Sequence, residues 1–241
     1  MTGIITGGSS GIGQAIADVL SENGHKVYVI SRSGKPKDEK TSVNKNIVHI
    51  KGDVCDYDEM KKIVDKIGAE DGIDFLVNNA GISVKRRAEE ITDEEFEKVH
   101  RVNVFAPFRL SVLCFPYLKK SANKGRIINI SSMAAHLGFD QVVPYVSSKG
   151  AIASLTRGLA VEWAGDNICV NAIAPGWFPS ELSRQVMDEQ RKQKILNRMP
   201  LHKFGDTRDI GSLVNFLISP AAAYITGSEY PVDGGALAFG F

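Results

Sequence analysis

Three side chains in the middle of the chain have the types and the spacing that proton transfer to an oxygen atom requires. Ser132 lies thirteen residues before Tyr145, and Lys149 lies four residues after it. Residues four apart share one face of a helix. A phenol titrates near pH ~10 in water and an adjacent ammonium favours the phenolate, so we expect Lys149 to lower the pKa of Tyr145. The Ser132 hydroxyl would hydrogen-bond a substrate oxygen as charge develops there. The set suits moving a proton on and off a carbonyl or alcohol oxygen.

The Tyr-x-x-x-Lys spacing is not specific by itself, because it occurs a second time, from Tyr57 to Lys61. That copy lies in a charged segment with no serine at the matching distance before it, and we interpret it as a solvated helix face. The Tyr145 copy instead follows an apolar strand at 126–130, whose end delivers Ser132. The surroundings therefore distinguish the two copies.

A glycine-rich turn near the start of the chain has the setting of a phosphate-binding loop. Residues 3–6 are an expected buried strand, residues 7–13 read Gly-Gly-Ser-Ser-Gly-Ile-Gly, and residues 14–20 are an expected amphipathic helix. A pyrophosphate binds the free backbone N–H groups of a helix N-terminus in this arrangement. The spacing is G-x-x-x-G-x-G rather than G-x-G-x-x-G, and the alternative is an ordinary tight turn. The flanking strand and helix favour phosphate binding.

Apolar strands alternate with amphipathic helices along the whole chain, which predicts the fold class. The pattern indicates an α/β fold, a three-layer Rossmann-type doubly wound parallel sheet in a single domain, residues 1–241. We expect strands at 3–6, 26–31, 47–51, 74–78, 126–130, 168–174 and 229–232, and helices at 14–20, 58–67, 92–117, 144–164 and 209–218. Residues 33–46 are an expected loop, and Pro107 should kink or break its long helix.

The candidate turns and loops each follow a strand of this sheet. The glycine turn follows the first strand, Asp53 the third, residues 78–81 the fourth, Ser132 the fifth and Pro175 the sixth. Ligands of such sheets bind outside the carboxyl ends of the strands. The expected topology therefore brings these residues to one edge of the sheet.

Together, the motifs resemble those of the short-chain dehydrogenase/reductase family over nearly the whole chain. The matching segments are the T-G-x-x-x-G-x-G loop at Thr6–Gly13, the N-N-A-G motif at Asn78–Gly81, the helix asparagine at Asn103, the catalytic residues Ser132, Tyr145 and Lys149, and the P-G turn at Pro175–Gly176. Motifs in the correct order and at the family's spacing are a specific signal.

The resemblance implies a role for each catalytic residue. Tyr145 would be the proton donor or acceptor, and Ser132 would polarise the substrate oxygen. Lys149 would lower the pKa of Tyr145 and hydrogen-bond the nicotinamide ribose. Asn103 would hold a water that relays protons to Lys149, although an asparagine at a helix kink can instead satisfy backbone groups.

The resemblance also implies which residues line the cofactor site. These are Gly7, Ser9, Ser10, Gly11, Ile12, Gly13, Arg32, Asp53, Val54, Asn79, Ala80, Gly81, Tyr145, Lys149, Pro175, Gly176, Phe178 and Ser180. Asp53 resembles the residue that contacts the adenine ring, and its alternative is a helix N-cap, a task that Asp56 could take instead. Ser180 stands where many members have a threonine that contacts the nicotinamide carboxamide.

The end of the second strand bears on the choice of cofactor. NAD-specific folds place an acid there to bind the ribose 2′-hydroxyl, whereas this strand ends Ile30-Ser31-Arg32-Ser33. The forked guanidinium of Arg32 suits the oxygens of a 2′-phosphate, and Ser31 and Ser33 could add hydroxyl donors. Alternatively, Arg32 points into solvent. Ser10 also stands where many NADP users carry a second basic residue. We expect NADP, with NAD as the alternative.

The expected function is an NADP-dependent oxidoreductase that interconverts a carbonyl and a secondary alcohol. Within the family the chain looks most like the 3-oxoacyl-[acyl-carrier-protein] reductases, with an acyl carrier protein as partner, and the sugar-acid dehydrogenases of the gluconate type. The first class expects a basic surface near the pocket, and the second expects polar groups inside it. A non-enzyme alternative is a cofactor-sensing regulatory protein, which should lack one catalytic residue.

Composition narrows the class of protein further. A chain of 241 residues with 43% hydrophobic and 24% charged residues is typical of a globular domain that needs no disulfide bonds or structural metal for stability. The net charge of +1 gives no attraction to nucleic acid or membrane. Three cysteines without paired spacing fit a reducing compartment, the scattered histidines predict no metal site, and no apolar run spans a bilayer. The first strand leaves no room for a signal peptide, so we expect the cytoplasm.

Two further expectations concern assembly and motion. Family members pair their two long helices, here 92–117 and 144–164, and apolar Phe105, Phe108, Leu110 and Leu113 exceed what one helix face needs. We therefore expect a homotetramer with two-fold axes. Residues 177–203 are highly charged and follow the sixth strand, where a substrate lid can close.

Overall fold

A seven-stranded sheet forms the centre of the computed structural model, which describes residues 1–37, 44–178 and 189–239. The strands are β1 (Thr2–Thr6), β2 (Lys26–Ser31), β3 (Ile47–Lys51), β4 (Phe75–Asn78), β5 (Gly125–Ile130), β6 (Ile168–Pro175) and β7 (Glu229–Val232). Their order is β3-β2-β1-β4-β5-β6-β7, and every pairing is parallel. The order reverses between β1 and β4, which creates the crevice in which such sheets bind ligands.

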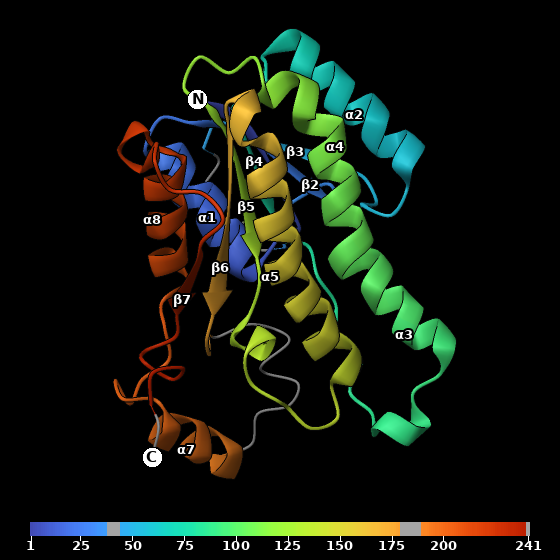
Figure 1. The fold of residues 1–241 in the computed structure, drawn as a ribbon, viewed down its shortest axis with the longest axis vertical. Coiled ribbons are helices and arrows are strands. Elements are labelled where there is room, and N and C mark those ends of the chain that lie inside the picture. The colour runs from blue at the N-terminus through green and yellow to red at the C-terminus, as the bar shows by residue number, and fades with distance from the viewer. Residues whose placement is uncertain (38–43, 179–188, 240–241) are drawn as a thin grey trace.

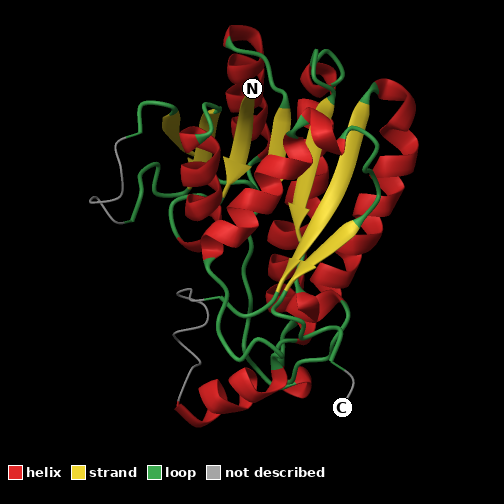
Figure 2. Cartoon of the chain, turned by 90° about the vertical axis from the view of Figure 1, so that its left-hand side faces the viewer, coloured by secondary structure: helices red, strands yellow, loops and turns green. Residues whose placement is uncertain are grey.

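Helices cover both faces of the sheet, as the alternating pattern predicted (Figures 1 and 2). The helices are α1 (Gly11–Glu22), α2 (Tyr57–Glu70), α3 (Asp93–His100), α4 (Ala106–Leu118), α5 (Val143–Trp163), α7 (Glu189–Arg198) and α8 (Thr207–Ile218). One hydrophobic cluster packs α1 and α8 against the sheet, and a second packs α2, α4 and α5 against its other face. The expected three-layer, doubly wound, single-domain fold is confirmed.

The central strands carry apolar runs because both of their faces are covered. Every residue of β4, β5 and β6 is buried, as expected for parallel strands between two helix layers. Alternate side chains of β5 point to opposite layers, with Ile127 in one hydrophobic cluster and Ile128 in the other. This packing fixes the register that delivers Ser132 at the end of β5.

The long helix expected at 92–117 is interrupted, and the interruption lies before the proline. Thr92 and Glu95 form a capping box that starts α3. A π-helical segment, η2 (Arg101–Phe105), then separates α3 from α4, and Pro107 lies in the first turn of α4. Proline has no N–H to donate to residue 103, so the α-helical pattern fails one turn upstream of it. The Ala106 N–H donates to Arg101 O instead.

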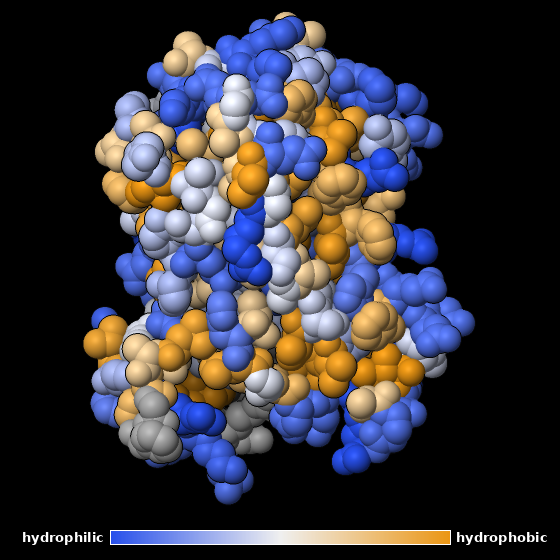
Figure 3. All heavy atoms as spheres, in the orientation of Figure 1, coloured by the Kyte–Doolittle hydropathy of each residue, from blue (hydrophilic) through white to orange (hydrophobic). Residues whose placement is uncertain are grey.

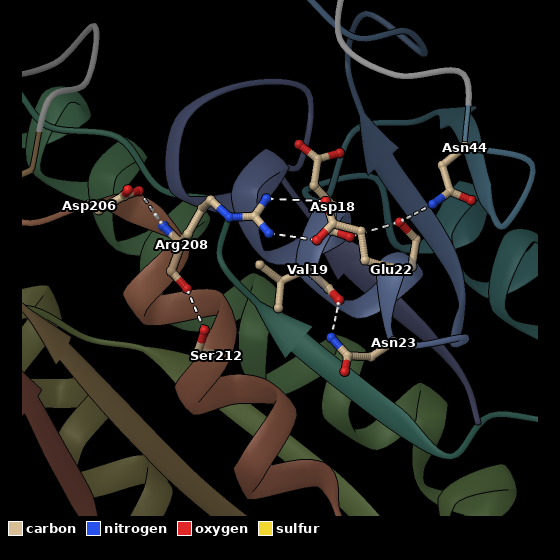
Figure 4. Close-up of polar contacts among 9 residues, drawn as sticks. Asp18, Val19, Glu22, Asn23, Asn44, Asp206, Arg208 and Ser212 are labelled. Carbon is tan, nitrogen blue, oxygen red and sulfur yellow. Dashed lines mark hydrogen bonds and ion pairs between the residues drawn. The ribbon is translucent and has the colours of Figure 1, made fainter.

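The first and last long helices are joined by charged and polar side chains. Arg208 of α8 binds Glu22 of α1 through both guanidinium Nη atoms, at 3.2 and 2.5 Å (Figure 4). Val19 of α1 is buried at the same interface, where a Cβ added to Gly211 of α8 would lie 2.8 Å from its side chain. Glycine at position 211 therefore lets the two helices approach closely.

Two sequence expectations fall partly outside the described residues. The loop expected at 33–46 contains no helix in its described parts, 33–37 and 44–46. Within the expected lid at 177–203, residues 179–188 lie outside the described part, and residues 189–198 form α7. In the described part of the chain, no helix is both long and apolar enough to cross a membrane.

Candidate active site

The candidate catalytic residues gather where β5 ends and α5 begins. Ser132 follows β5 and is the N-cap of a short 3₁₀ helix, η3 (Met133–Ala135), where its hydroxyl oxygen accepts the N–H of Ala134 at 3.1 Å. Tyr145 lies in the first turn of α5 and hydrogen-bonds the Ser132 side chain. The pair expected from spacing alone is therefore in contact.

Lys149 lies one helical turn after Tyr145 and is buried. Its Nζ lies 5.5 Å from the centre of the Tyr145 ring and donates a 2.7 Å hydrogen bond to the carbonyl oxygen of Ile130. Burial lowers the pKa of Lys149 to about 8, because an ammonium loses its hydration there. Its only charge-stabilising partner in hydrogen-bond reach within the described residues is thus a backbone dipole.

The expected lowering of the Tyr145 pKa is wrong for the protein without its ligands. Burial disfavours the phenolate and raises the pKa of Tyr145, and the hydrogen bond with Ser132 offsets this only in part. Tyr145 therefore carries its proton at neutral pH. A protonated phenol in this position is a proton donor, which is what reduction of a carbonyl needs.

Asn103 holds a backbone segment rather than facing open space. From the π-helical segment its Oδ1 accepts the N–H of Ile82, while Nδ2 donates to Ile82 O, each at 2.9 Å. Nδ2 also donates to Ser148 Oγ at 3.0 Å. These contacts favour the alternative interpretation, in which the asparagine satisfies backbone groups, and they lock the loop after β4 to the catalytic helix.

The glycine turn is hydrogen-bonded to the end of β4. Thr6 Oγ1 accepts the N–H groups of Asn79 and Ala80, at 3.1 and 3.0 Å. The Asn79 amide in turn donates to Thr6 O and Gly7 O, at 2.9 and 3.1 Å. Two segments more than seventy residues apart thus form one rigid floor at the switch point of the sheet.

The sterics of this turn require glycine at two positions for different reasons. Gly7 has φ +68°, and a Cβ there would lie 2.8 Å from the Ala80 Cα. A Cβ on Gly13 would lie 2.4 Å from the Asn79 side chain. Gly11 also has positive φ, but it faces open space at the first residue of α1. The turn is therefore closed on the protein side and open on the other.

The N-terminus of α1 is available to an anion. Its N-cap, Ser10, makes no side-chain cap hydrogen bond in the structure, which leaves the first N–H groups of the helix for another acceptor. Ile12 packs on the core and Ser9 is partly buried, so both hold the turn in place. This cradle fits the pyrophosphate of a dinucleotide, because positive dipole and free N–H groups coincide there.

Arg32 lies at the far side of the same floor. It is exposed, and its charge reaches Cys55, where burial and Asp53 raise the pKa of the thiol while Arg101 and Arg32 lower it. Ser31 and Ser33 hydrogen-bond one another and the turn around Gly34, so their hydroxyls serve the loop.

A second basic residue near the turn was not expected from the sequence. The Lys37 N–H donates to Ser9 O at 2.9 Å, which brings the loop after β2 alongside the glycine turn. The sequence shows a lysine five residues after Arg32. It does not show that the loop brings this lysine to the glycine turn, because that depends on the backbone contact with Ser9.

Asp53 and Asp56 divide two tasks in the turn after β3. Asp56 is the N-cap of α2 and accepts the Glu59 N–H at 2.9 Å. Asp53 accepts the Cys55 N–H through one carboxylate oxygen and is exposed. Asp53 is therefore not the helix cap. Val54, beside it, lines a narrow crevice with Thr6 and Ala80.

The segment after β6 closes the other end of the floor. Pro175 is buried at the end of β6, and the Gly176 N–H donates to Val232 O at 2.9 Å. The Phe178 side chain lies in the hydrophobic core, so its contribution to a cofactor site would come from its backbone. Gly81 is exposed after β4, and a Cβ there would lie 3.7 Å from Lys149 Nζ. Ser180 lies outside the described residues.

A cavity of about 540 Å³ lies beside this segment. Most of its wall is apolar, from Trp177, Phe178, Met199, Pro200, Leu201, Phe204, Pro231 and Val232, with Lys203, Asp209 and Asp233 as its charged residues. Trp177 also meets Phe139, in the segment before α5, edge to face at 6.1 Å between ring centres. The catalytic side chains are not part of the cavity wall, and Trp177 joins the cavity to the segment that leads into α5.

The second Tyr-x-x-x-Lys copy is an exposed helix face, as predicted. Tyr57 and Lys61 lie in the first turns of α2, where Lys61 forms an ion pair with Asp65. In the described part of the chain, no three His, Cys, Asp or Glu side chains are grouped as a metal site would require.

Comparison with known proteins agrees with this geometry. Residues 7–236 match the family model described as enoyl-(acyl carrier protein) reductase. A tropinone reductase homologue of Arabidopsis thaliana is 34% identical over 100% of this chain and 93% of its own length. The 2-dehydro-3-deoxy-D-gluconate 5-dehydrogenase of Dickeya dadantii is 37% identical over 98% of this chain and 94% of its own.

Solved structures of other proteins have the same fold over nearly the whole chain. A short-chain type dehydrogenase/reductase of Mycobacterium marinum has a TM-score of 0.89 at 30% identity, covering 98% of this chain and 94% of its own. A gluconate 5-dehydrogenase of Burkholderia cenocepacia, in complex with NADP and tartrate, has a TM-score of 0.89 at 28% identity, covering 98% and 95%. The fold and site define a dinucleotide-binding oxidoreductase. The chain belongs to the short-chain dehydrogenase/reductase family.

Proposed function

We propose that this protein reduces a ketone to a secondary alcohol with NADPH. The cofactor, when bound, supplies the hydride to the carbonyl carbon. The observation that carries the proposal is the contact of Ser132 with a partly buried, protonated Tyr145, one turn from Lys149. The complete catalytic set gives no support to a sensing protein without activity.

In this mechanism each side chain has one task at the substrate oxygen. Tyr145 gives its proton to the oxygen as negative charge develops on it. Ser132 donates a hydrogen bond to the same oxygen. Its own oxygen already accepts the Ala134 N–H, and its hydroxyl hydrogen, which is shared with Tyr145 in the structure, can turn to the substrate oxygen. The Lys149 ammonium stabilises the tyrosinate that remains after transfer.

The preference for NADP rests on Arg32. No acid stands at the end of β2, where the exposed Arg32 follows Ser31, and β2 is the direct neighbour of β1, which carries the glycine turn. The Burkholderia cenocepacia enzyme and the RhlG protein of Pseudomonas aeruginosa, 33% identical to this chain, were both solved as NADP complexes. These neighbours support the same choice here.

For the substrate, the apolar cavity favours a ketone with an apolar body. The aromatic pair of Trp177 and Phe139 and the largely apolar wall would accept the acyl chain of a 3-oxoacyl thioester or a cyclic ketone. A carrier protein would need a basic surface near the site, yet Arg86 and Arg87 on the adjacent loop are paired with Glu95 and Glu89. A free thioester is therefore the preferred form.

A sugar acid is the second candidate. The similarity to the Dickeya dadantii and Burkholderia cenocepacia enzymes favours it. Lys85 lies exposed on the loop whose Arg86 N–H binds Gln141 O at 2.8 Å, four residues before Tyr145. A cation at this rim would attract a carboxylate.

A turnover screen tests the function. Purified protein with NADPH or NADH is given acetoacetyl and longer 3-oxoacyl thioesters, bicyclic and monocyclic ketones, and 5-keto-gluconate, and loss of reduced-cofactor absorbance is followed. We expect turnover with NADPH and an apolar ketone. Turnover with keto-gluconate and with none of the apolar ketones would show that the substrate is a sugar acid.

Tyr145→Phe tests the mechanism on the best substrate from the screen. The substitution removes one hydroxyl and little volume, so kcat should fall by about 10²-fold or more while the NADPH dissociation constant changes less than about twofold. Tyr57→Phe, in the second Tyr-x-x-x-Lys copy, is the matched control and should keep full activity. A Tyr145→Phe protein with near-normal kcat would contradict the mechanism.

A further inference from the structure

A hydrogen-bonded pair of side chains, His136 and Glu229, ties the catalytic loop to the edge of the sheet. His136 Nε2 lies 2.6 Å from Glu229 Oε2. His136 ends the 3₁₀ turn η3, and Glu229 is the first residue of β7, the last strand of the sheet. The imidazole is 46% exposed, whereas the carboxylate side chain is 13% exposed.

The turn that His136 ends is the same turn that Ser132 begins. Ser132 O accepts the Ala135 N–H at 2.9 Å, and Met133 O accepts the N–H groups of His136 and Leu137, each at 3.0 Å. Residues 132–137 therefore move as one compact unit. Its start is fixed to β6 through the 2.7 Å bond from Ser131 N–H to Ile173 O.

The sheet register brings Glu229 toward this unit. Asn129 of β5 pairs with Ala172 of β6, which pairs with Glu229 of β7. Residues in register across parallel strands point to the same face. The Asn129 side chain binds Thr156 of α5, so all three face the α5 layer. The small side chain of Ala172 between the other two leaves room for the Glu229 carboxylate to reach the end of η3.

The carboxylate is short of partners without the histidine. Glu229 Oε1 is buried and has no hydrogen-bond partner among the described residues, and His136 supplies the contact for the other oxygen. A largely buried carboxylate is costly unless it is paired. The hydrogen bond to His136 stabilises the Glu229 carboxylate, so it favours one position of His136. Because His136 and Ser132 belong to the same turn, it also favours one position of Ser132.

We propose that His136 and Glu229 are positioning residues that hold the Ser132 hydroxyl against Tyr145. The inference rests on the proposed reduction, in which Ser132 binds the substrate oxygen. The pair itself touches neither substrate nor cofactor. It acts by fixing the far end of the turn, as a misplacement of a catalytic group by about 1 Å can cost 10²-fold in rate.

A double-mutant cycle tests the route through Ser132. Glu229→Ala and His136→Ala should each lower kcat at least tenfold, with the NADPH dissociation constant unchanged within twofold. In a Ser132→Ala background the same substitutions should lower kcat less than twofold, because the group they position is gone. Asp166→Ala is the matched control, since it breaks the 2.6 Å ion pair with Lys119, between other elements. It should leave kcat unchanged.

Hydrogen exchange gives a reading that does not depend on turnover. Glu229→Ala should speed exchange of the amides at 133–137 at least fivefold and leave those of β5 unchanged, and Asp166→Ala should do neither. Unaltered exchange at 133–137, wild-type kcat in Glu229→Ala, or an equal loss of kcat in the Ser132→Ala background would each overturn the proposal. A wild-type protein that reduces no ketone would refute the proposed function, while the exchange result still decides whether the pair holds the turn.

Discussion

Lys149 is a buried cation next to the partly buried phenol of Tyr145, and this proximity sets the pH range of the site. The ammonium has its pKa lowered to about 8, whereas the pKa of Tyr145 is raised, both chiefly through burial. As pH rises, the lysine therefore loses its proton before the tyrosine does. The lysine, not the tyrosine, should limit reduction at alkaline pH.

The pH profile of reduction tests this order. Below about pH 8 Lys149 is charged and can stabilise the tyrosinate, and above it Lys149 becomes neutral. We expect kcat/KM for reduction to fall as pH rises through about 8. In Lys149→Arg the side chain stays charged at alkaline pH. We expect this variant to have a lower kcat/KM than the wild type, with no fall in kcat/KM as pH rises through about 8. A fall at the same pH in Lys149→Arg would assign it to another group.

The cofactor preference depends on Arg32. We expect NADPH over NADH by at least about tenfold in kcat/KM, which corresponds to ~1.4 kcal/mol. Arg32→Asp should reverse the preference, because a carboxylate repels a 2′-phosphate and binds a 2′-hydroxyl. Steady-state kinetics with both cofactors measures it, and Lys66→Asp, on the exposed side of α2, is the charge control. Unchanged preference in Arg32→Asp would remove Arg32 from the site.

Site residues could be predicted from the sequence where the geometry of one helix or one strand is enough to bring them together. Tyr145 and Lys149 are fixed by helical spacing, and Ser132 by the strand before it, so sequence was sufficient. The pKa of Tyr145 and the bond from Lys149 to Ile130 O depend on how deeply the pair is buried. Burial is a tertiary property, which explains why the direction of the Tyr145 shift was predicted wrongly.

At the scale of elements, the π-helical segment η2 places one side chain, Asn103, where it bonds two other segments. We call this set of hydrogen bonds the Asn103 clamp. The segment presents Asn103 to both backbone groups of Ile82 and to Ser148 of α5. Three layers of the site, namely the loop after β4, η2 and α5, are joined by one side chain. This clamp is structural, in addition to any role of Asn103 in proton relay.

Removing the clamp should cost stability as well as activity. Asn103→Ala leaves the partly buried N–H and C=O of Ile82 and the buried Ser148 hydroxyl without this partner, and an unsatisfied buried polar group costs about 1–3 kcal/mol. We expect the free energy of unfolding to fall by about 2 kcal/mol or more in urea titration. The exposed Asn123→Ala provides the control, with little change. Equal stability of the two variants would mean that the clamp contributes nothing.

The elements themselves followed from hydrophobic pattern and turn residues. β2 and β7 have the predicted bounds, and the break in the long helix was predicted from Pro107 but placed too late. The proline acts on the carbonyl one turn before it, which a residue-by-residue pattern does not reveal. The path of the loop to Lys37 was equally hidden, because it depends on a contact with Ser9.

At the scale of the whole molecule, one helical face is left apolar. Figure 3 shows apolar side chains over α4 and beside α5. Phe105, Phe108 and Val112 are 61, 38 and 40% exposed, and Val161 of α5 is 82% exposed. Leu110 and Leu113, expected on this surface, lie instead in the protein's own core. The remaining exposed apolar side chains mark this face as a candidate contact surface.

We expect these helices to pair across two-fold axes in a homotetramer. Phe105→Asp should abolish one interface, because a charge there cannot be buried in an apolar contact, and should leave a dimer. Light scattering at micromolar concentration measures the mass. Tyr224→Asp, at a fully exposed aromatic side chain outside α4 and α5, is the control and should keep the wild-type mass. A monomeric wild-type protein would rule out the assembly.

The turn after β1 depends on residues that are synthesised much later. Thr6 accepts the N–H groups of Asn79 and Ala80, which lie 73 and 74 residues further along the chain. Synthesis proceeds at roughly 5–20 residues per second, so the first strand, turn and helix exist for roughly 4–15 seconds without the partners that shape the turn. During translation the turn therefore lacks the contacts with Asn79 and Ala80 that fix its shape. The complete floor of the cofactor site forms only after these two residues have been synthesised.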